Sequence, residues 1–468
     1  MNFYRITFAE YVSLFTDMDI PKFHFNAEQL STEITKLLSA NYINQVAKDK
    51  GFTIRDSGKL DGFMFLDMMV YTHFNHKLLS LNDLSVQLHK RYGIGISKQS
   101  IDKRFNSMAV DFFTKVLESV ININIESNLE FDFTNYQSVK IKDSTSFQLP
   151  ENMKDKYPGS GGAASKAAIR IQFEYDLKNK NILDLSIHAF TKQDTTNAKE
   201  TLKTIKPDEL IIRDLGYIII DVLRQIVALG AYYLNRLPAN VVVFEMKQGK
   251  LVELDFTKLL KMLRRNGIQR IDKEVYIGRG EKFKTRIIIE LIPDKIYKQR
   301  LRKANKTAKS KGSMISKKRK TRLALNLFIT NTDIPASQVR QLYTLRWQIE
   351  LMFKIWKSIG EIDKVKKMKI ERFEVSLIAK LIWIALNWKI MSHILLSYYR
   401  NSDILLSPYK IFKTLKMYTF DFRKAIIAGI QSVVSLINSI AEISPKNHLS
   451  EMKNKKLWSY DVIKIFAN

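Results

Sequence analysis

The stretch YTLRWQIELMFKIWKS, residues 343–358, combines an apolar helical pattern with polar residues at regular spacings. At about 100° per residue, Tyr343, Arg346, Glu350 and Lys357 fall within an arc of roughly 60° on a helical wheel. The neighbouring arc is apolar and is the side that would be buried. It holds Leu342, Leu345, Ile349, Met352, Phe353 and Trp356. We therefore predict one uninterrupted helix whose polar stripe runs beside its buried face.

This helix, taken alone, also has an ordinary structural explanation. Arg346 and Glu350 stand four residues apart, which is the spacing of a surface ion pair on a helix. Lys357 would then be a solvated lysine, and the tryptophan and methionine side chains would be plain core. A functional interpretation therefore depends on residues elsewhere in the chain.

Two aspartates earlier in the chain follow apolar strand patterns. In VKIKDSTSFQLP a strand is predicted to end on Asp143, and in ELIIRDLGY another is predicted to end on Asp214. Each aspartate, taken singly, is more commonly a turn former or a helix cap. If the two strands are neighbours in a sheet and the helix supplies Glu350, the three carboxylates form a cluster of oxygen ligands for hard divalent cations.

Together these residues resemble a known family. Asp143-Ser-Thr with Leu149-Pro150, Arg213-Asp214-Leu-Gly-Tyr217, and the spacing Tyr-x2-Arg-x3-Glu-x6-Lys from 343 to 357 resemble the DDE transposases of bacterial insertion sequences. The resemblance covers residues 140–360 or so. It implies an α/β fold, with an RNase H-like mixed-sheet catalytic core, a β-strand insertion that interrupts this core, and helical N-terminal and C-terminal regions.

The resemblance also implies roles for the motif residues. The catalytic and metal-binding triad would be Asp143, Asp214 and Glu350. The residues that contact DNA near the scissile phosphate would be Tyr343, Arg346, Trp347 and Lys357. The expected cofactor is a pair of Mg²⁺ ions, for which Mn²⁺ can substitute. Two such ions activate a water or 3′-hydroxyl nucleophile and stabilise the leaving oxygen, while Arg346 and Lys357 hold the phosphodiester in line.

Periodicity along the chain changes from helical to strand-like and back to helical. Residues 131–230 follow the order β-β-β-α-β-α, which predicts a mixed sheet with helices against it. The predicted parts are a helical DNA-end-binding domain (1–130), the first part of the core (131–230), a β-rich insertion with a basic arm (231–332), the second part of the core with the Glu350 helix (333–400), and a helical C-terminal region (401–468).

Residues 81–106, LNDLSVQLHKRYGIGISKQSIDKRFN, predict two helices joined by a glycine turn. The second helix would begin after Ser97 as its N-cap. This is the outline of a helix-turn-helix motif, which would present Lys98, Lys103 and Arg104 to phosphates or base edges. Two ordinary packed helices with solvated lysines explain the pattern equally well.

Residues 295–322 contain many Lys and Arg and no acidic residue. The segment is either a solvated loop or an arm that follows the phosphate backbone of DNA. We favour the arm, because crowded basic side chains repel one another unless an anion relieves them. Its densest part is Lys317, Lys318, Arg319 and Lys320.

The composition restricts the partners and the compartment. Across 468 residues the formal net charge is +29, which indicates a polyanionic partner. The absence of cysteine excludes thiolate zinc sites, disulfides and a cysteine nucleophile, and fits a reducing compartment. The N-terminus lacks the pattern of a secretory signal. The apolar run at 376–396 includes Lys380, Lys389 and His393, so we expect a buried helix, no membrane partner, and a bacterial cytoplasmic protein associated with the nucleoid.

Other signals are weaker. His73 and His76 have no third ligand nearby in the sequence, so ordinary helix residues are expected there. The glycine-rich stretch 158–165 lacks the Gly-Lys-Ser/Thr of a P-loop, so no nucleotide cofactor is expected. Rival carboxylates to the triad are Asp176, Asp184 and Asp194, of which Asp184 is the closest competitor to Asp214.

The predicted insertion contains no tryptophan. Relatives that pass through a DNA hairpin use a tryptophan there to stack a flipped base, so the resemblance leaves hairpin formation open. Tyr276, Phe283 or Tyr297 could stack a base instead.

The sequence as a whole predicts a transposase that cuts and pastes an insertion sequence. Its DNA partners would be the terminal inverted repeats and the target, held by a synaptic homodimer. Two alternatives stay open at this point: a stand-alone metal-dependent nuclease of the same fold, and a non-enzymatic DNA-binding regulator derived from a transposase.

Overall fold

The structure is a computed structural model that describes residues 25–54, 59–72, 80–123, 136–161, 165–179, 181–310, 312–402 and 404–450. The described residues divide into two compact units. The helical unit draws on 1–129 and 354–456, and the sheet unit draws on 130–353. The five-part division of the chain stays a prediction.

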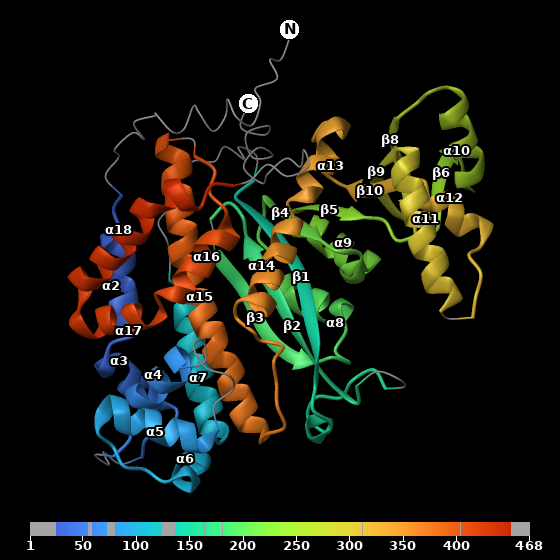
Figure 1. Cartoon of the computed structure of the whole chain (residues 1–468). Coiled ribbons are helices and arrows are strands. Elements are labelled where there is room, and N and C mark those ends of the chain that lie inside the picture. The colour runs from blue at the N-terminus through green and yellow to red at the C-terminus, as the bar shows by residue number, and fades with distance from the viewer. Residues whose placement is uncertain are drawn as a thin grey trace. The chain divides into compact units, whose positions relative to one another are not determined.

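A ten-stranded sheet organises the sheet unit, with the strand order β3-β2-β1-β4-β5-β10-β9-β8-β6-β7 (Figure 1). Its first half is built from β1 (Ser138–Leu149), β2 (Ala167–Asp176), β3 (Asn181–Ala189), β4 (Glu209–Arg213) and β5 (Tyr232–Arg236). The first three strands pair antiparallel, and β4 is parallel to both β1 and β5. With α8 (Asp194–Glu200) before β4 and α9 (Ile220–Ala228) before β5, the predicted order and the RNase H-like mixed sheet are confirmed.

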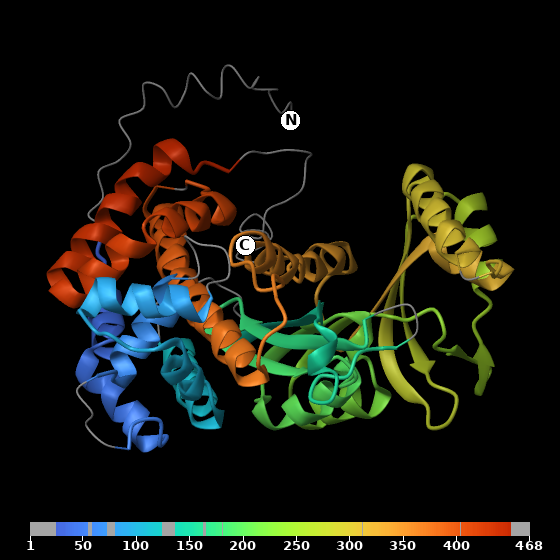
Figure 2. The same cartoon turned by 60° about the horizontal axis from the view of Figure 1, so that its bottom comes forward.

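Helices cover both faces of this sheet, which is why β4 reads as a continuous apolar run and is buried throughout. On one face, residues of α8, α9 and α10 (Phe256–Arg265) share a core with Ile211 of β4 and Ile329 of β10. On the other face lie α13 (Ala336–Thr344) and α14 (Trp347–Ser358), where Tyr343 packs against Phe328 of β10. In Figure 2 the green α9 and the orange α13 lie on opposite sides of the sheet.

The insertion continues the core sheet. The predicted range 231–332 begins with β5, which pairs with the core strand β4, and its further strands are β6 (Val243–Lys247), β7 (Lys250–Glu253), β8 (Arg270–Ile277), β9 (Phe283–Leu291) and β10 (Leu325–Thr330). Because β10 pairs antiparallel with both β5 and β9, it joins the inserted strands to the core. Gln248 and Gly249 form the tight turn between β6 and β7, and both have positive φ, as a two-residue hairpin turn requires.

The basic segment 295–322 is not a loop, whereas its role as an arm that follows the phosphate backbone stays a prediction. It forms two helices, α11 (Asp294–Lys309) and α12 (Lys317–Leu323). Lys, Arg, Gln and Ala are good helix formers, and Ala304 and Ala308 bury themselves against Ile315. These few apolar side chains are therefore sufficient to hold the segment in helices, although its high charge suggested an irregular structure.

The helical unit combines helices from both ends of the chain. Those before the sheet are α2 (Glu28–Leu37), α3 (Ala40–Asp49), α4 (Gly62–Thr72), α5 (Leu81–Tyr92), α6 (Lys98–Arg104) and α7 (Ser107–Ile121). Those after it are α15 (Ile370–Ser402), α16 (Pro408–Met417), α17 (Thr419–Ala428) and α18 (Ile430–Asn447). The long α15 packs along α7 and α4, so it forms the centre of the unit.

Helix α15 is long and apolar enough to cross a membrane over Ile370–Tyr399, but its apolar window is wholly buried within the protein. The expectation of a buried helix is confirmed. Its lysines are accommodated by backbone carbonyls: Lys389 donates to Ile123 and Lys380 donates to Glu361, at 2.7 and 2.6 Å.

Candidate active site

Asp143 lies in the middle of β1, so the prediction that the strand ends there was wrong. The parallel ladder between β1 and β4 stops at the Lys142–Arg213 pair, but the antiparallel ladder with β2 continues to Leu149. Asp143 therefore follows the last residue of β1 that pairs with β4. Its carboxylate accepts a hydrogen bond from the Ser144 backbone N–H at 2.8 Å.

Asp214 directly follows the last residue of β4, as predicted. It occupies the N-cap position of the short turn η3 (Leu215–Tyr217). Since Lys142 and Arg213 are the last pair of the parallel ladder, the two aspartates occupy equivalent positions just beyond the end of that ladder. Parallel pairing thus brings together two carboxylates that are 71 residues apart in the sequence.

The stretch 343–358 is not one uninterrupted helix, and this prediction was also wrong. Tyr343 belongs to α13, Glu350 and Lys357 belong to α14, and a turn at Leu345 and Arg346 separates the two helices. Amides in this turn bond to carbonyls three residues back, as in Arg346 to Tyr343, which tightens the chain relative to an α-helix. The predicted apolar side is nevertheless buried.

The three candidate carboxylates converge on one guanidinium, that of Arg346. Its Nη1 lies 2.6 Å from Oδ2 of Asp143, and its Nη2 lies 2.7 Å from Oε1 of Glu350. Its Nε lies 3.7 Å from Oδ1 of Asp214, which also accepts a hydrogen bond from the Tyr343 hydroxyl at 3.3 Å. The Arg346 side chain is only 8% exposed, whereas that of Glu350 is 55% exposed. The cluster thus has a buried basic centre and an open acidic side.

Burial and charge act in opposite directions in this cluster. Burial raises the pKa of Asp143 to about 6, although Arg346 and the Ser144 N–H act to lower it. Burial acts to lower the pKa of Arg346, but the charges around it, Asp214 first, raise the pKa above its ordinary value. Burial raises the pKa of the Tyr343 hydroxyl, which therefore stays protonated and donates to Asp214.

The donor set of the cluster suits a hard divalent cation. Three carboxylates reach one cationic group, and carboxylate oxygens are the ligands that Mg²⁺ takes in proteins. As the side chains stand, however, no group of three His, Asp or Glu among the described residues is arranged to hold a metal ion. The guanidinium of Arg346 lies between the carboxylates and donates hydrogen bonds to two of them.

The rival carboxylates are engaged in other contacts. Asp184 on β3 lies 2.9 Å from Nζ of Lys142, and Asp194 lies 2.8 Å from Arg170. Asp176 accepts a hydrogen bond from Ser138. Each is thus held by a structural partner within the sheet unit.

Sequence reasoning missed a buried charge network beside the two aspartates. Glu174 on β2 lies 3.4 Å from Nζ of Lys142 and 3.5 Å from Nη2 of Arg213, and all three side chains are almost fully buried. Lys142 and Arg213 immediately precede Asp143 and Asp214, so this network fixes the two strand ends relative to each other. Strongly charged residues inside apolar strand patterns were the signal that could have revealed it.

The helix-turn-helix outline has the expected local structure. Helix α5 ends at Gly93, which adopts the left-handed conformation, and Ser97 caps α6 by accepting from the Ser100 N–H. Lys98 and Lys103 are exposed, whereas Arg104 lies half-buried over the ring of Phe52. A DNA-binding role for these residues stays a prediction.

Helix α12 carries a run of exposed basic residues. Lys317, Lys318, Arg319 and Lys320 are all exposed, and Lys318 lies 3.3 Å from Glu253. The basic residues of β8 and β9 are matched by neighbouring acids, as in Lys273–Glu245, Lys284–Glu274 and Arg286–Asp272. The basic run of α12 is therefore less fully matched by acids than the basic residues of these two strands.

Where the structure describes the remaining sequence signals, they add no second site. His73 and His76 lie outside the described residues. Tyr276, Phe283 and Tyr297 are half-buried, and Tyr297 lies under Arg264.

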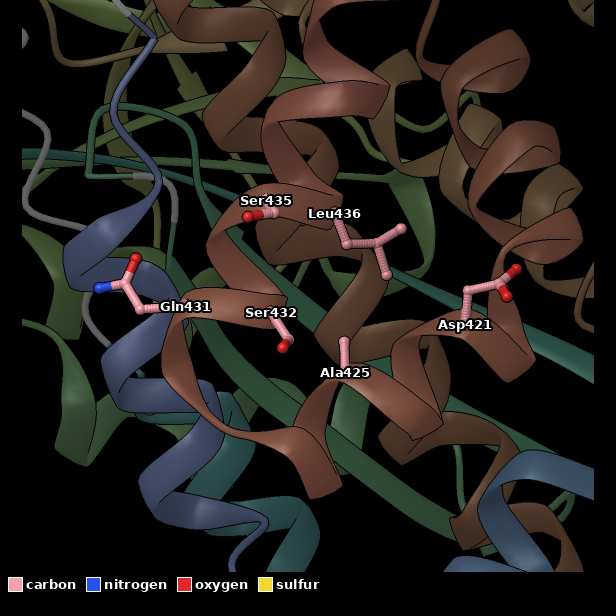
Figure 3. Close-up of a pocket in the computed structure, with 6 residues that line it drawn as sticks. All are labelled: Asp421, Ala425, Gln431, Ser432, Ser435 and Leu436. Atoms are coloured by element: carbon pink, nitrogen blue, oxygen red, sulfur yellow. The ribbon is translucent and has the colours of Figure 1, made fainter.

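A shallow hollow of about 510 Å³ between α17 and α18 holds none of the predicted site residues (Figure 3). Its lining is Asp421, Ala425, Gln431, Ser432, Ser435 and Leu436.

Comparison with known proteins agrees with the resemblance found in the sequence. A family model described as "Transposase DDE domain" matches residues 136–388. The chain is 31% identical, over 92% of its length and 94% of the relative, to the transposase for insertion sequence element IS231D of Bacillus thuringiensis subsp. finitimus. It is 30% identical, with the same coverage, to the transposase for element IS231E of that organism. Identity to the transposase for element IS1151 of Clostridium perfringens is 29%, over 93% of this chain and 96% of the relative.

Proposed function

Because the chain belongs to the DDE transposase family and is an enzyme that acts on DNA, we propose that it moves an insertion sequence by a cut-and-paste reaction. It cleaves at the terminal inverted repeats of the element and joins the freed 3′-hydroxyl ends to target DNA. It does so in the bacterial cytoplasm, on the nucleoid, where both DNA partners are found.

Asp143, Asp214 and Glu350 are the catalytic residues of this proposal. Its main support is that carboxylates from β1, from the end of β4 and from α14 contact a single cationic group. Enzymes of this family use divalent metal ions, and we assign two Mg²⁺ ions, replaceable by Mn²⁺, to these carboxylates. Such ions activate the attacking oxygen and stabilise the leaving oxygen of the phosphodiester.

The residues around the triad position the DNA strand. Arg346 offers a planar fork that binds a phosphate through two hydrogen bonds. Tyr343 donates its hydroxyl hydrogen, and Lys357, two helical turns beyond Glu350 on α14, supplies a point charge. Trp347 is 46% exposed, and its exposed ring surface is assigned to stack on a base or sugar.

More distant basic residues bind the rest of the DNA. Lys98, Lys103 and Arg104 on α6 read the element's ends, and the α12 residues Lys317 to Lys320 follow the phosphate backbone. A net charge of +29 favours such contacts. We assign a homodimer to the synaptic complex, because both ends must be cut and joined together.

The proposal is tested with purified protein, a DNA carrying the element's own ends, a supercoiled target plasmid and Mg²⁺. The wild type is expected to cut the ends and to yield joined product. Asp143→Ala, Asp214→Ala and Glu350→Ala are each expected to bind the ends but to lose cleavage by at least about a hundredfold, since each removes a carboxylate needed for the metal ions.

Asp184→Asn is the matched control, because this rival carboxylate lies in the same sheet but contacts Lys142. It is expected to cut and join. Cleavage without joined product would reduce the proposal to a nuclease, and full cleavage by the alanine variants would overturn the assignment of the triad.

A further inference from the structure

One side chain of the candidate site contacts all three members of the proposed triad. Arg346 makes close, hydrogen-bonded ion pairs with Asp143 and Glu350, at 2.6 and 2.7 Å. Its contact with Asp214 is longer, at 3.7 Å, and Asp214 has a second contact with Tyr343. The guanidinium of Arg346 therefore lies at the centre of the three carboxylates.

Three carboxylates that approach one another repel, and the cost grows as water is excluded. Asp143 is only 18% exposed, so water screens its charge poorly. The guanidinium offsets this repulsion. Its fork geometry lets two of its nitrogens donate to different carboxylates at once.

We propose that Arg346 is the resident counter-cation of the triad: its guanidinium gathers the three carboxylates before divalent ions bind, and it withdraws when the ions replace it. This inference rests on the proposed assignment of Asp143, Asp214 and Glu350. A divalent cation on the same oxygens would meet the charge of the guanidinium at short range and would need lone pairs that now accept its hydrogen bonds, so the two cations compete for the carboxylates.

The location of Arg346 in the chain suits this exchange. It lies in the turn between α13 and α14, four residues before Glu350. Its side chain can therefore turn away without unwinding a helix. Once withdrawn, the guanidinium is free to bind a phosphate, so the site acquires its phosphate-binding group only after the metal ions are in place. Arg346 in this role is a positioning residue that couples ion binding to DNA binding.

The experiment measures Mn²⁺ binding to the whole protein without DNA, by titration calorimetry, together with the melting temperature of the ion-free protein. Arg346→Gln removes the competing cation, so it is expected to bind Mn²⁺ about tenfold more tightly than the wild type. Without Mn²⁺, Arg346→Gln is expected to melt at a lower temperature than the wild type. Added Mn²⁺ is expected to raise its melting temperature more than it raises that of the wild type. Arg346→Lys, which keeps the charge, is expected to lie between the two.

Arg170→Gln is the matched control, because Arg170 also pairs with a carboxylate in this sheet, that of Asp194. It is expected to leave Mn²⁺ affinity unchanged. Equal or weaker Mn²⁺ binding by Arg346→Gln, in protein whose circular dichroism matches that of the wild type, would overturn the inference. If Arg346→Gln does not fold, Arg346→Lys alone decides: Mn²⁺ binding tighter than that of the wild type supports the inference, and equal or weaker binding overturns it.

Failure of the inference is distinguishable from failure of the proposed function. Asp143→Asn and Glu350→Gln are measured in the same titration. If they lose Mn²⁺ binding while Arg346→Gln behaves as the wild type, the triad stands and the counter-cation role fails. If they bind Mn²⁺ like the wild type, the triad assignment itself is wrong.

Discussion

At the scale of residues, the candidate site depends on charges that are buried in matched groups. Glu174 is held between Lys142 and Arg213, and these three side chains have almost no exposure. Removing one partner of a buried ion pair leaves the others uncompensated, which costs far more than the loss of a surface pair. The charges beside Asp143 and Asp214 therefore set the register of the strands that carry them.

Glu174→Ala is expected to lower the free energy of unfolding by roughly 3–5 kcal/mol, since Lys142 and Arg213 then stay buried without a counter-ion. Hydrogen exchange of the β1 and β4 amides measures this. Glu151→Ala, which breaks an exposed pair with Lys166, is the control and is expected to change stability far less, because solvent screens an exposed pair. Equal effects of the two substitutions would contradict the role of the network.

Lys389 gives a dependence of stability on pH. Burial lowers the pKa of this lysine to about 8. Between that value and its ordinary pKa of about 10.4, the unfolded chain binds more protons than the folded chain, so stability rises with pH across this window. In Lys389→Met, the rise between pH 8 and 10 is expected to be smaller, by an amount on the order of 3 kcal/mol. Urea denaturation at several pH values measures it, and an unchanged rise would show that the lysine does not titrate in this window.

At the scale of elements, local sequence patterns predicted the order of the helices and strands, whereas some of their ends depend on pairing with strands that are distant in the sequence. The order of strands and helices over 131–230 followed from periodicity, as did the buried side of α14. The end of β1 could not be predicted, because only its pairing with β2 carries it past Asp143 to Leu149. The turn at Leu345 and Arg346 could not be predicted either, since that sequence has good helix formers and no Gly or Pro.

The candidate site was similarly predictable in its members but not in its arrangement. Spacing and resemblance are sufficient to propose Asp143, Asp214 and Glu350 as a cluster. The position of Arg346 among them depends on the bend between α13 and α14, which a regular helical wheel cannot represent. Glu174 lies on a third strand, and no local pattern links it to either aspartate.

Helix α12 leads to a prediction about DNA binding. Replacing Lys317, Lys318, Arg319 and Lys320 by Gln is expected to weaken binding to any DNA sequence and to reduce the slope of log K against log salt by about 3. Filter binding at several salt concentrations measures it. The control is Lys273→Gln with Lys284→Gln, because these lysines are already paired with acids. An unchanged slope in the α12 variant would place the phosphate contacts elsewhere.

At the scale of the whole molecule, the account requires residues that are distant in sequence to share one metal centre. A continuous sheet carries two of the carboxylates, and a helix on its face carries the third. Replacement of Mg²⁺ by Fe²⁺, followed by ascorbate and peroxide, generates radicals that cut the polypeptide next to the bound ion. Mapping these cuts by mass spectrometry tests the shared centre directly. We predict cuts near residues 143, 214 and 350 that disappear together in Asp143→Asn, whereas cuts confined to one of these segments, or located elsewhere, would contradict a common metal site.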